Sequence, residues 1–178
     1  MQEYDFTLKF SLKTLSTDPS TYLDSLYESG CDDAFIGIGK TGYISLDFTR
    51  ESSGAFEALS SAIKDVKEAI PEAVLIEATP DLVGITDIAQ VINCSRQNVR
   101  KIMTGNDEQI PMPMHEGNPS LWHLASVLEW MKQADCYAVD ENVLSIAKLN
   151  MTLNATRSLY QIDESLQKEA ESLVAIAS

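Results

Sequence analysis

Five side chains that can bond to nucleic acid fall within a stretch of six positions, RQNVRK. They are Arg96, Gln97, Asn98, Arg100 and Lys101. Arg forms paired hydrogen bonds to guanine, Gln and Asn form them to adenine, and Arg or Lys neutralises backbone phosphates. We expect Arg96 and Gln97 to contact base edges and Lys101 to contact a phosphate. These residue types favour recognition of double-stranded DNA.

Residues 85–103 have the pattern of two short helices joined by a tight turn, a helix-turn-helix. Thr86 is the expected N-cap of the first helix, Asn93 occupies the turn position that needs a positive φ, and Ser95 caps the second helix. Small or apolar side chains are spaced to pack between the helices: Ile88, Ala89, Ile92, Cys94, Val99 and Ile102. A purely structural helical hairpin is the alternative that this pattern leaves open.

The segment after the second helix predicts an extended run, a turn at residues 115–119, a short strand around Leu121 and a helix from about His123 to Met131. It contains the motif Pro111-Met112-Pro113, and Trp122 and Trp130 bracket the expected helix. With these features, residues 82–131 resemble the winged helix-turn-helix of the excisionase and mercury-resistance-regulator (MerR-like) superfamily.

The resemblance implies a DNA-binding protein that reads its site with the second helix and places a wing near the DNA backbone or minor groove. The wing contains Glu116, and its only potential cation is His115. The expected DNA contacts are Ser95, Arg96, Gln97, Asn98, Arg100, Lys101 and His115.

The first eighty residues have the order strand, helix, strand, strand, helix, strand. The alternation of Tyr4, Phe6 and Leu8 is typical of a half-buried strand, and Asp18 followed by Pro19 is a helix start. The remaining expected elements are strands at 33–39, 42–48 and 73–78 and a helix at 54–70 whose apolar face includes Phe56. This order matches a ferredoxin-like split βαβ unit, an antiparallel four-stranded sheet with two helices on one face. We expect it to act as a sensor or a protein-interaction module.

Two other functions for this region fit the sequence poorly. The stretch AFIGIGKT ends like a phosphate-binding P-loop, but Ala34 replaces its first glycine and a strand rather than a helix is expected after Thr41. Tyr43 and Phe48 are placed like the stacking aromatics of RNA-recognition sheets. However, residues 1–80 carry 6 basic and 14 acidic residues, and this balance of −8 repels a phosphate backbone.

The net charge of −14 does not exclude DNA binding, because charge is unevenly distributed. Residues 81–132 have a balance of −2, and Arg96, Arg100 and Lys101 supply three of their four basic groups. Screening over about 8 Å at physiological salt lets this patch act despite distant acidic groups. The few phosphate contacts of one subunit predict a homodimer on a two-fold site.

Residues 140–177 contain no Gly or Pro and predict one long amphipathic helix, or two helices broken near Asn154. Their apolar residues recur mostly every three or four positions: Ile146, Leu149, Leu153, Leu159, Ile162, Leu166, Ala170 and Leu173. This face is expected to contact a partner subunit, with packing on its own chain as the alternative. The expected class is therefore α+β, with a ferredoxin-like domain at 1–80, a winged helix-turn-helix at 81–132 and a helical dimerisation tail at 133–178.

The sequence favours a cytoplasmic protein that is not an enzyme. It has no apolar run of the roughly 18 residues that span a bilayer and no signal-peptide pattern. Cys31, Cys94 and Cys136 are widely spaced, and His115 and His123 have no metal ligands at suitable spacing, so no disulfide, metal or cofactor is expected. The function expected is that of a sequence-specific DNA-binding transcriptional repressor. The alternative is an antitoxin or acidic adaptor whose N-terminal domain binds a protein partner.

Overall fold

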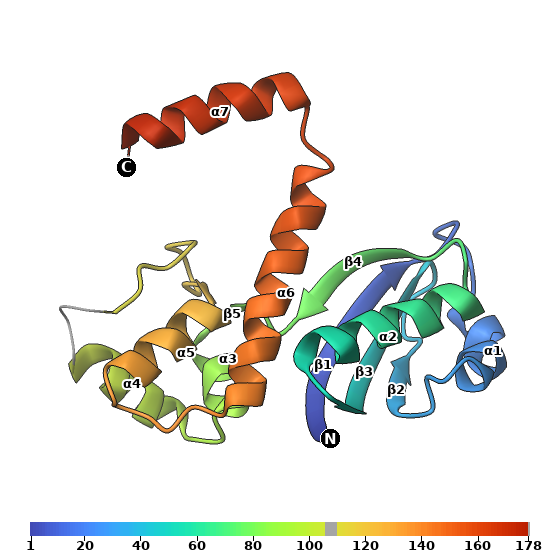
Figure 1. Cartoon of the computed structure of the whole chain (residues 1–178), viewed down its shortest axis with the longest axis horizontal. Coiled ribbons are helices and arrows are strands. Elements are labelled where there is room, and N and C mark those ends of the chain that lie inside the picture. Colours follow the sequence, from blue (N-terminus) through green and yellow to red (C-terminus); the bar gives the residue numbers. More distant parts are fainter. Residues whose placement is uncertain (106–109, 178) are drawn as a thin grey trace.

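The chain is a mixed α+β protein in which a four-stranded antiparallel sheet is followed by a group of helices (Figure 1). The computed structural model describes residues 1–105 and 110–177. The sheet unit comprises β1 (Gln2–Ser11), the 3₁₀ turn η1 (Pro19–Tyr22), α1 (Leu23–Glu28), β2 (Ala34–Gly37), β3 (Tyr43–Ser52), α2 (Ala55–Ala69) and β4 (Val74–Thr79).

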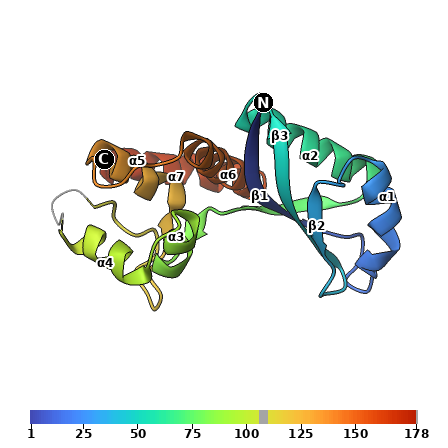
Figure 2. The same ribbon diagram turned by 90° about the horizontal axis from the view of Figure 1, so that it is seen from below.

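The strands lie in the order β2-β3-β1-β4, and every neighbouring pair is antiparallel. Alternate residues of β1, beginning with Tyr4, Phe6 and Leu8, are buried on one face, as their spacing predicts. Figure 2 shows α1 and α2 together on one side of this sheet. α2 buries Ala58, Leu59, Ala62 and Val66, whereas Phe56, expected on its apolar face, is 67% exposed. That part of the prediction was wrong because, at 3.6 residues per turn, Phe56 lies at the edge of the face formed by the buried residues of α2.

The Gly-Lys-Thr segment lies in the loop of the β2–β3 hairpin. β3 begins at Tyr43, so a strand follows where a P-loop has a helix. Gly42 has a φ of 77°, and the Leu15 Cα lies 2.5 Å from the position of a Cβ added to Gly42. Phe48 is buried and stacks on Phe6 with a centroid distance of 5.3 Å, while Tyr43 lies on the opposite face of the sheet. The two aromatic residues therefore cannot form one stacking platform for RNA.

Arg50 of β3 ties the sheet to α2 and to the loop between α1 and β2. Its guanidinium donates to both carboxylate oxygens of Asp33, to Asp65 on α2, to Ser61 and to the Gly30 carbonyl, at 2.6–3.0 Å. All five N–H donors of the guanidinium thus have partners. Burial opposes the charge, but the hydrogen bonds and charges of the two carboxylates outweigh it and raise the pKa of Arg50.

The second unit has its own hydrophobic core. Its elements are β5 (Leu82–Val83), α3 (Ile85–Val91), α4 (Arg96–Gly105), β6 (Trp122–His123) and α5 (Leu124–Gln133). Val99, Leu124, Val127, Leu128 and Met131 lie at the centre of this core, each fully buried. β5 pairs with β6, and this pairing attaches the segment just before α5 to the segment just before α3.

α6 (Glu141–Leu159) packs on both units. Ile146 belongs to the core of the sheet unit, and Leu144 and Ala147 belong to the core of the second unit. Asn154 of α6 exchanges hydrogen bonds with both backbone groups of Ala78, at 2.8 and 2.9 Å, and donates to Asp81 at 2.8 Å. Asp81, which is 4% exposed, also contacts the His123 Nδ1 at 2.6 Å. The linker between the units is therefore held to α6 and to the start of α5.

α7 (Glu164–Ala177) follows a turn at residues 160–163 and has no buried residue. The expected break near Asn154 was wrong, because Asn154 is bonded within the middle of α6. The break occurs where Asp163 accepts hydrogen bonds from the Ser165 and Leu166 backbone N–H groups, at 2.8 and 3.3 Å, as N-cap residues do. None of the helices in the described ranges is long and apolar enough to cross a membrane.

Candidate nucleic-acid interface

Two short helices joined by a tight turn, α3 and α4, form where the sequence predicts them, with one difference at the start of α3. α3 begins two residues earlier than expected, with Gly84 as its N-cap, and the Gly84 N–H donates to the Asp87 Oδ2 at 2.8 Å. The assignment of Thr86 as the N-cap was wrong because Asp87 supplies the carboxylate that closes the first turn. Thr86 lies within α3 and is exposed.

The turn between α3 and α4 follows the prediction residue by residue. Asn93 has a φ of 51°, the left-handed conformation that Asn tolerates better than most residues. Cys94 is half-buried against the second core, and the Ser95 Oγ accepts from the Asn98 N–H at 3.1 Å to cap α4. Tyr137, after α5, donates its hydroxyl to the Ile92 carbonyl at 2.6 Å, so the turn is also held from outside the helix pair.

α4 buries one side and exposes the other. Val99 and Met103 are buried, and Ile102 is half-buried. The residues expected to contact DNA are all exposed: Ser95, Arg96, Gln97, Asn98, Arg100 and Lys101. In the described part of the chain, the side chains of Arg96, Gln97, Arg100 and Lys101 make no hydrogen bond or ion pair. In contrast, Lys9, Lys13, Arg50, Lys132 and Lys148 each contact a carboxylate.

Residues 111–121 in front of α5, where the sequence predicts a wing, form a loop closed by one short bridge, and this loop is called the wing below. Met114 N–H and His115 N–H both approach the Leu121 carbonyl, at 2.8 and 3.3 Å, and the Leu121 N–H donates to the His115 carbonyl at 3.0 Å. The Trp122 Nε1 donates to the Pro111 carbonyl at 3.0 Å, which holds the start of the wing to its end. The expected contact residue His115 is exposed, and its ring lies so close to Gly117 that a Cβ there would stand 2.5 Å from the His115 Nε2.

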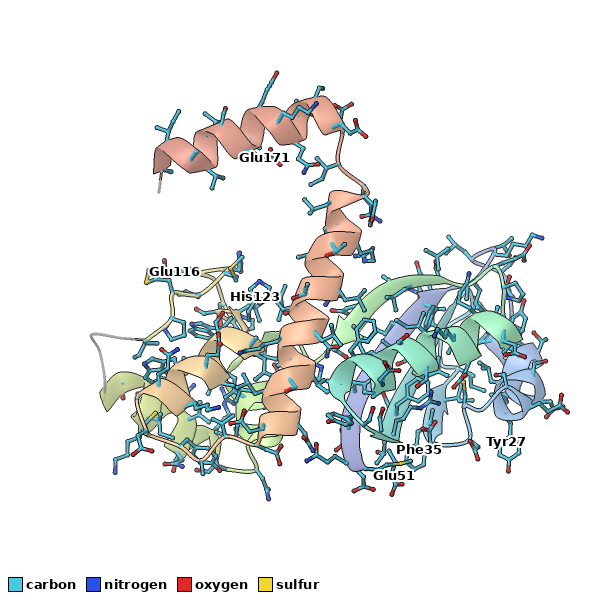
Figure 3. All side chains as sticks on the ribbon, viewed as in Figure 1. Tyr27, Phe35, Glu51, Glu116, His123 and Glu171 are labelled. Atoms are coloured by element: carbon cyan, nitrogen blue, oxygen red, sulfur yellow. The ribbon has the colours of Figure 1, made fainter. Side chains whose placement is uncertain are left out.

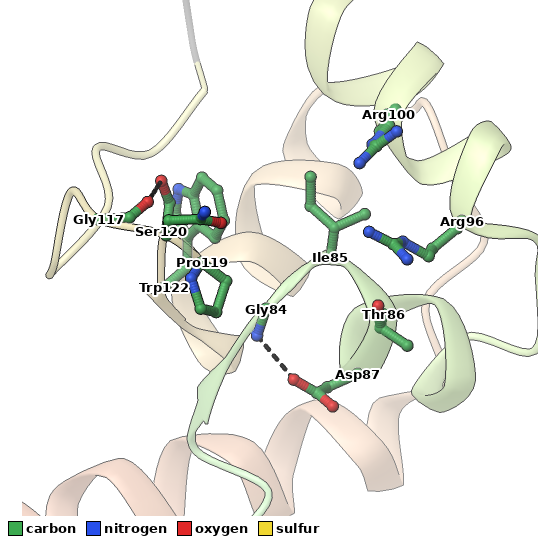
Figure 4. Close-up of a pocket in the computed structure, with 11 residues that line it drawn as sticks. Gly84, Ile85, Thr86, Asp87, Arg96, Arg100, Gly117, Pro119, Ser120 and Trp122 are labelled. Carbon is green, nitrogen blue, oxygen red and sulfur yellow. Dashed lines mark hydrogen bonds between the residues drawn. The ribbon is translucent and has the colours of Figure 1, made fainter.

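A cleft of about 480 Å³ separates α4 from the wing. Arg96 and Arg100 line one side of it, and Gly117, Pro119 and Ser120 of the wing line the other (Figure 4). The first turn of α3 closes one end with Thr86 and Asp87. The structure thus brings two of the expected DNA contacts together with the wing, while His115 is not among the cleft residues.

Sequence reasoning missed Thr86, Asp87 and Ser120 as neighbours of the two arginines. No local signal could have found them, because Thr86 and Asp87 come from α3, Ser120 comes from the loop before β6, and the arginines come from α4. It also missed the Asp81, His123 and Asn154 cluster, although a buried Asp between two units is the kind of residue that requires partners. The described residues contain no cluster of His, Cys, Asp or Glu that could hold a metal ion.

Comparison of the chain with models of protein families, with curated proteins and with solved structures finds no match. The residues and their geometry are therefore the basis for assigning a function.

Proposed function

We propose that this protein is a sequence-specific double-stranded DNA-binding protein that acts as a transcriptional repressor. The observation that carries the proposal is the exposed face of α4, on which Arg96, Gln97, Arg100 and Lys101 lie free of partners in the described part of the chain. Long polar side chains held on a rigid helix suit the major groove, where Arg, Lys and Gln bond to base edges and phosphates.

The fold supports this proposal in two places. α3 and α4 joined by a tight turn, the paired β5 and β6, and the loop before α5 are the parts of a winged helix-turn-helix. The strand order β2-β3-β1-β4 with two helices on one face agrees with a ferredoxin-like unit, to which we assign a sensor or interaction role.

A homodimer is part of the proposal. Leu166 and Leu173 of α7 lie seven residues apart and are 60% and 66% exposed. An apolar row at this spacing on a projecting helix suits pairing with a second helix of the same kind. A two-fold dimer would place two α4 helices about one turn of DNA apart, roughly 34 Å.

Selection from a random duplex library with the purified full chain tests the proposal. We expect enrichment of a sequence with two related half-sites, bound at least 10³-fold more tightly than a scrambled duplex. The triple variant Arg96→Ala, Arg100→Ala, Lys101→Ala should lose binding, whereas Lys64→Ala should keep it. Lys64 is a suitable control because it is an exposed cation on α2. A library that shows no enrichment at low salt would refute the proposal.

One observation favours a second function, an acidic adaptor or antitoxin that binds a protein partner through its N-terminal unit. Phe35 and Tyr27, labelled in Figure 3, are 82% and 68% exposed. Large exposed apolar side chains are enriched at protein interfaces. The two functions differ in whether the purified chain alone shifts the selected duplex. Binding that appears only after a partner is added would favour the adaptor.

A further inference from the structure

The cleft between α4 and the wing holds two arginines that repel each other in the unbound protein. Arg96 and Arg100 are four residues apart, so they lie one turn above the other on the same side of α4. Figure 4 shows both guanidinium groups directed from α4 toward Ile85, with the wing across the cleft. Like charges at this spacing destabilise a helix unless an anion lies between them. In the described residues, no carboxylate pairs with either group.

The charge of the cleft indicates which anion it suits. Among the described residues that line the cleft, Asp87 is the acidic one, and its Oδ2 accepts the hydrogen bond from the Gly84 N–H. Two guanidinium groups and one carboxylate leave a formal charge of +1. A phosphodiester carries one negative charge, whereas a free phosphate or a terminal phosphate monoester carries about two near pH 7. The hydroxyl of Thr86 adds a hydrogen-bond donor on another wall, whereas the Ser120 hydroxyl donates to the Gly117 carbonyl at 3.2 Å.

The helical positions separate these arginines from the base-reading face. With 3.6 residues per turn, the direction opposite buried Val99 and Met103 coincides with Lys101, and Gln97 lies about 40° from it. Arg96 and Arg100 lie on the flank of α4 next to the wing, and Asn98 lies on the other flank. Gln97 and Lys101 therefore project farthest from the protein, toward the floor of a groove into which α4 inserts.

Resting on the DNA-binding function proposed above, we propose that the Arg96–Arg100 cleft clamps one backbone phosphodiester of the DNA, and that Gln97 and Lys101 read the bases. This assignment reverses the roles that residue types alone suggest for Arg96 and Lys101. The clamp fixes the depth and register of α4 in the groove, and it supplies affinity that is independent of sequence.

The first test compares variants on the selected and the scrambled duplex over a range of salt concentrations. Arg96→Ala and Arg100→Ala should weaken binding to both duplexes by the same factor. The double variant should lower the slope of log K against log salt by about 1 per subunit, because one phosphate is no longer neutralised and about one fewer counterion is released on binding. Gln97→Ala should weaken only the selected duplex, by about 10- to 100-fold. Lys64→Ala is the control, and thermal melting should show that all variants remain folded.

The second test locates the phosphate. Each phosphodiester of the selected duplex is replaced in turn by an uncharged methylphosphonate. At one position in each half-site, the replacement should weaken DNA binding by the wild type about 10-fold. It should leave binding by the double variant Arg96→Ala, Arg100→Ala unchanged. A free anion is tested by calorimetry with inorganic phosphate, and saturable binding that Arg100→Ala abolishes would assign the cleft to a free phosphate instead.

The outcomes separate this inference from the proposed function. If Arg96→Ala weakens only the selected duplex, Arg96 reads a base and the clamp is refuted, although the protein still binds DNA. If no methylphosphonate position depends on the two arginines, the clamp is also refuted. If the wild type binds no duplex, both the clamp and the proposed function fail.

Discussion

Replacing Arg50 by alanine removes the centre of the ion network that joins the sheet to α2 and to the loop before β2. The Arg50 side chain is 8% exposed, and its five donors bond to Asp33, Asp65, Ser61 and the Gly30 carbonyl. The variant leaves two carboxylates at the surface of a hydrophobic core without their cation. It also removes the guanidinium that lies 4.9 Å from the centre of the Phe48 ring.

The expected loss of stability follows from the burial of these groups. Breaking a buried ion pair by removing one partner costs about 3–5 kcal/mol. Because the Asp33 and Asp65 side chains remain 28% and 25% exposed, water partly solvates them after the substitution. We therefore expect the lower end, about 3 kcal/mol. With a urea dependence of about 2 kcal/mol/M, the unfolding midpoint should fall by about 1.5 M.

Urea unfolding followed by far-ultraviolet circular dichroism and by tryptophan fluorescence measures this loss. Trp122 and Trp130 both belong to the second unit, while Arg50 belongs to the first. Since α6 packs on both cores, we expect the two probes to report one transition and to shift together. Arg50→Lys should retain part of the stability, because one ammonium cannot bond to both carboxylates as the planar guanidinium does. Lys64→Ala should change stability by less than about 0.5 kcal/mol.

A loss below about 1 kcal/mol for Arg50→Ala would refute the reasoning, since it would mean that the network contributes no more than a surface ion pair. A shift seen only by circular dichroism would leave the network intact but show that the two units unfold separately.

Three further predictions concern other parts of the chain. Burial raises the pKa of Cys31 to about 11, so its thiolate is scarce near pH 8. Alkylation of the native protein, followed by mass spectrometry, should therefore label Cys94 first and Cys31 last, and early labelling of Cys31 would contradict its burial. Leu166→Glu with Leu173→Glu should convert the dimer to a monomer in light scattering with little change in helix content, whereas a persistent dimer would place the interface elsewhere, for example along the edge of the sheet. Asn154→Ala should lower the free energy of unfolding by about 1–3 kcal/mol, because the backbone groups of Ala78 and the carboxylate of Asp81 lose hydrogen-bond partners. An unchanged urea midpoint would show that water replaces the amide.

Local features could be predicted from the sequence because their causes lie within a few residues. The alternation of Tyr4, Phe6 and Leu8 sets one buried face of β1. Ser95 caps α4 by accepting a hydrogen bond from the Asn98 N–H, only three residues along the chain. The break before α7 also had a local signal, since Asp163 lies two residues before Ser165, the spacing of an N-cap. The absence of Gly and Pro obscured that signal.

Other features depend on contacts between distant segments, and only the tertiary structure decided them. The exposed set on α4 followed from helical spacing, but the position of the wing determined that Arg96 and Arg100 line a cleft. The partners of Arg50 come from the loop before β2 and from α2. α6 was expected to belong to a dimerisation tail, but it packs on both cores. The spacing of its apolar residues does not reveal where the two units lie relative to the helix. Spacing along a helix sets which residues share a face, whereas the rest of the chain sets what that face contacts.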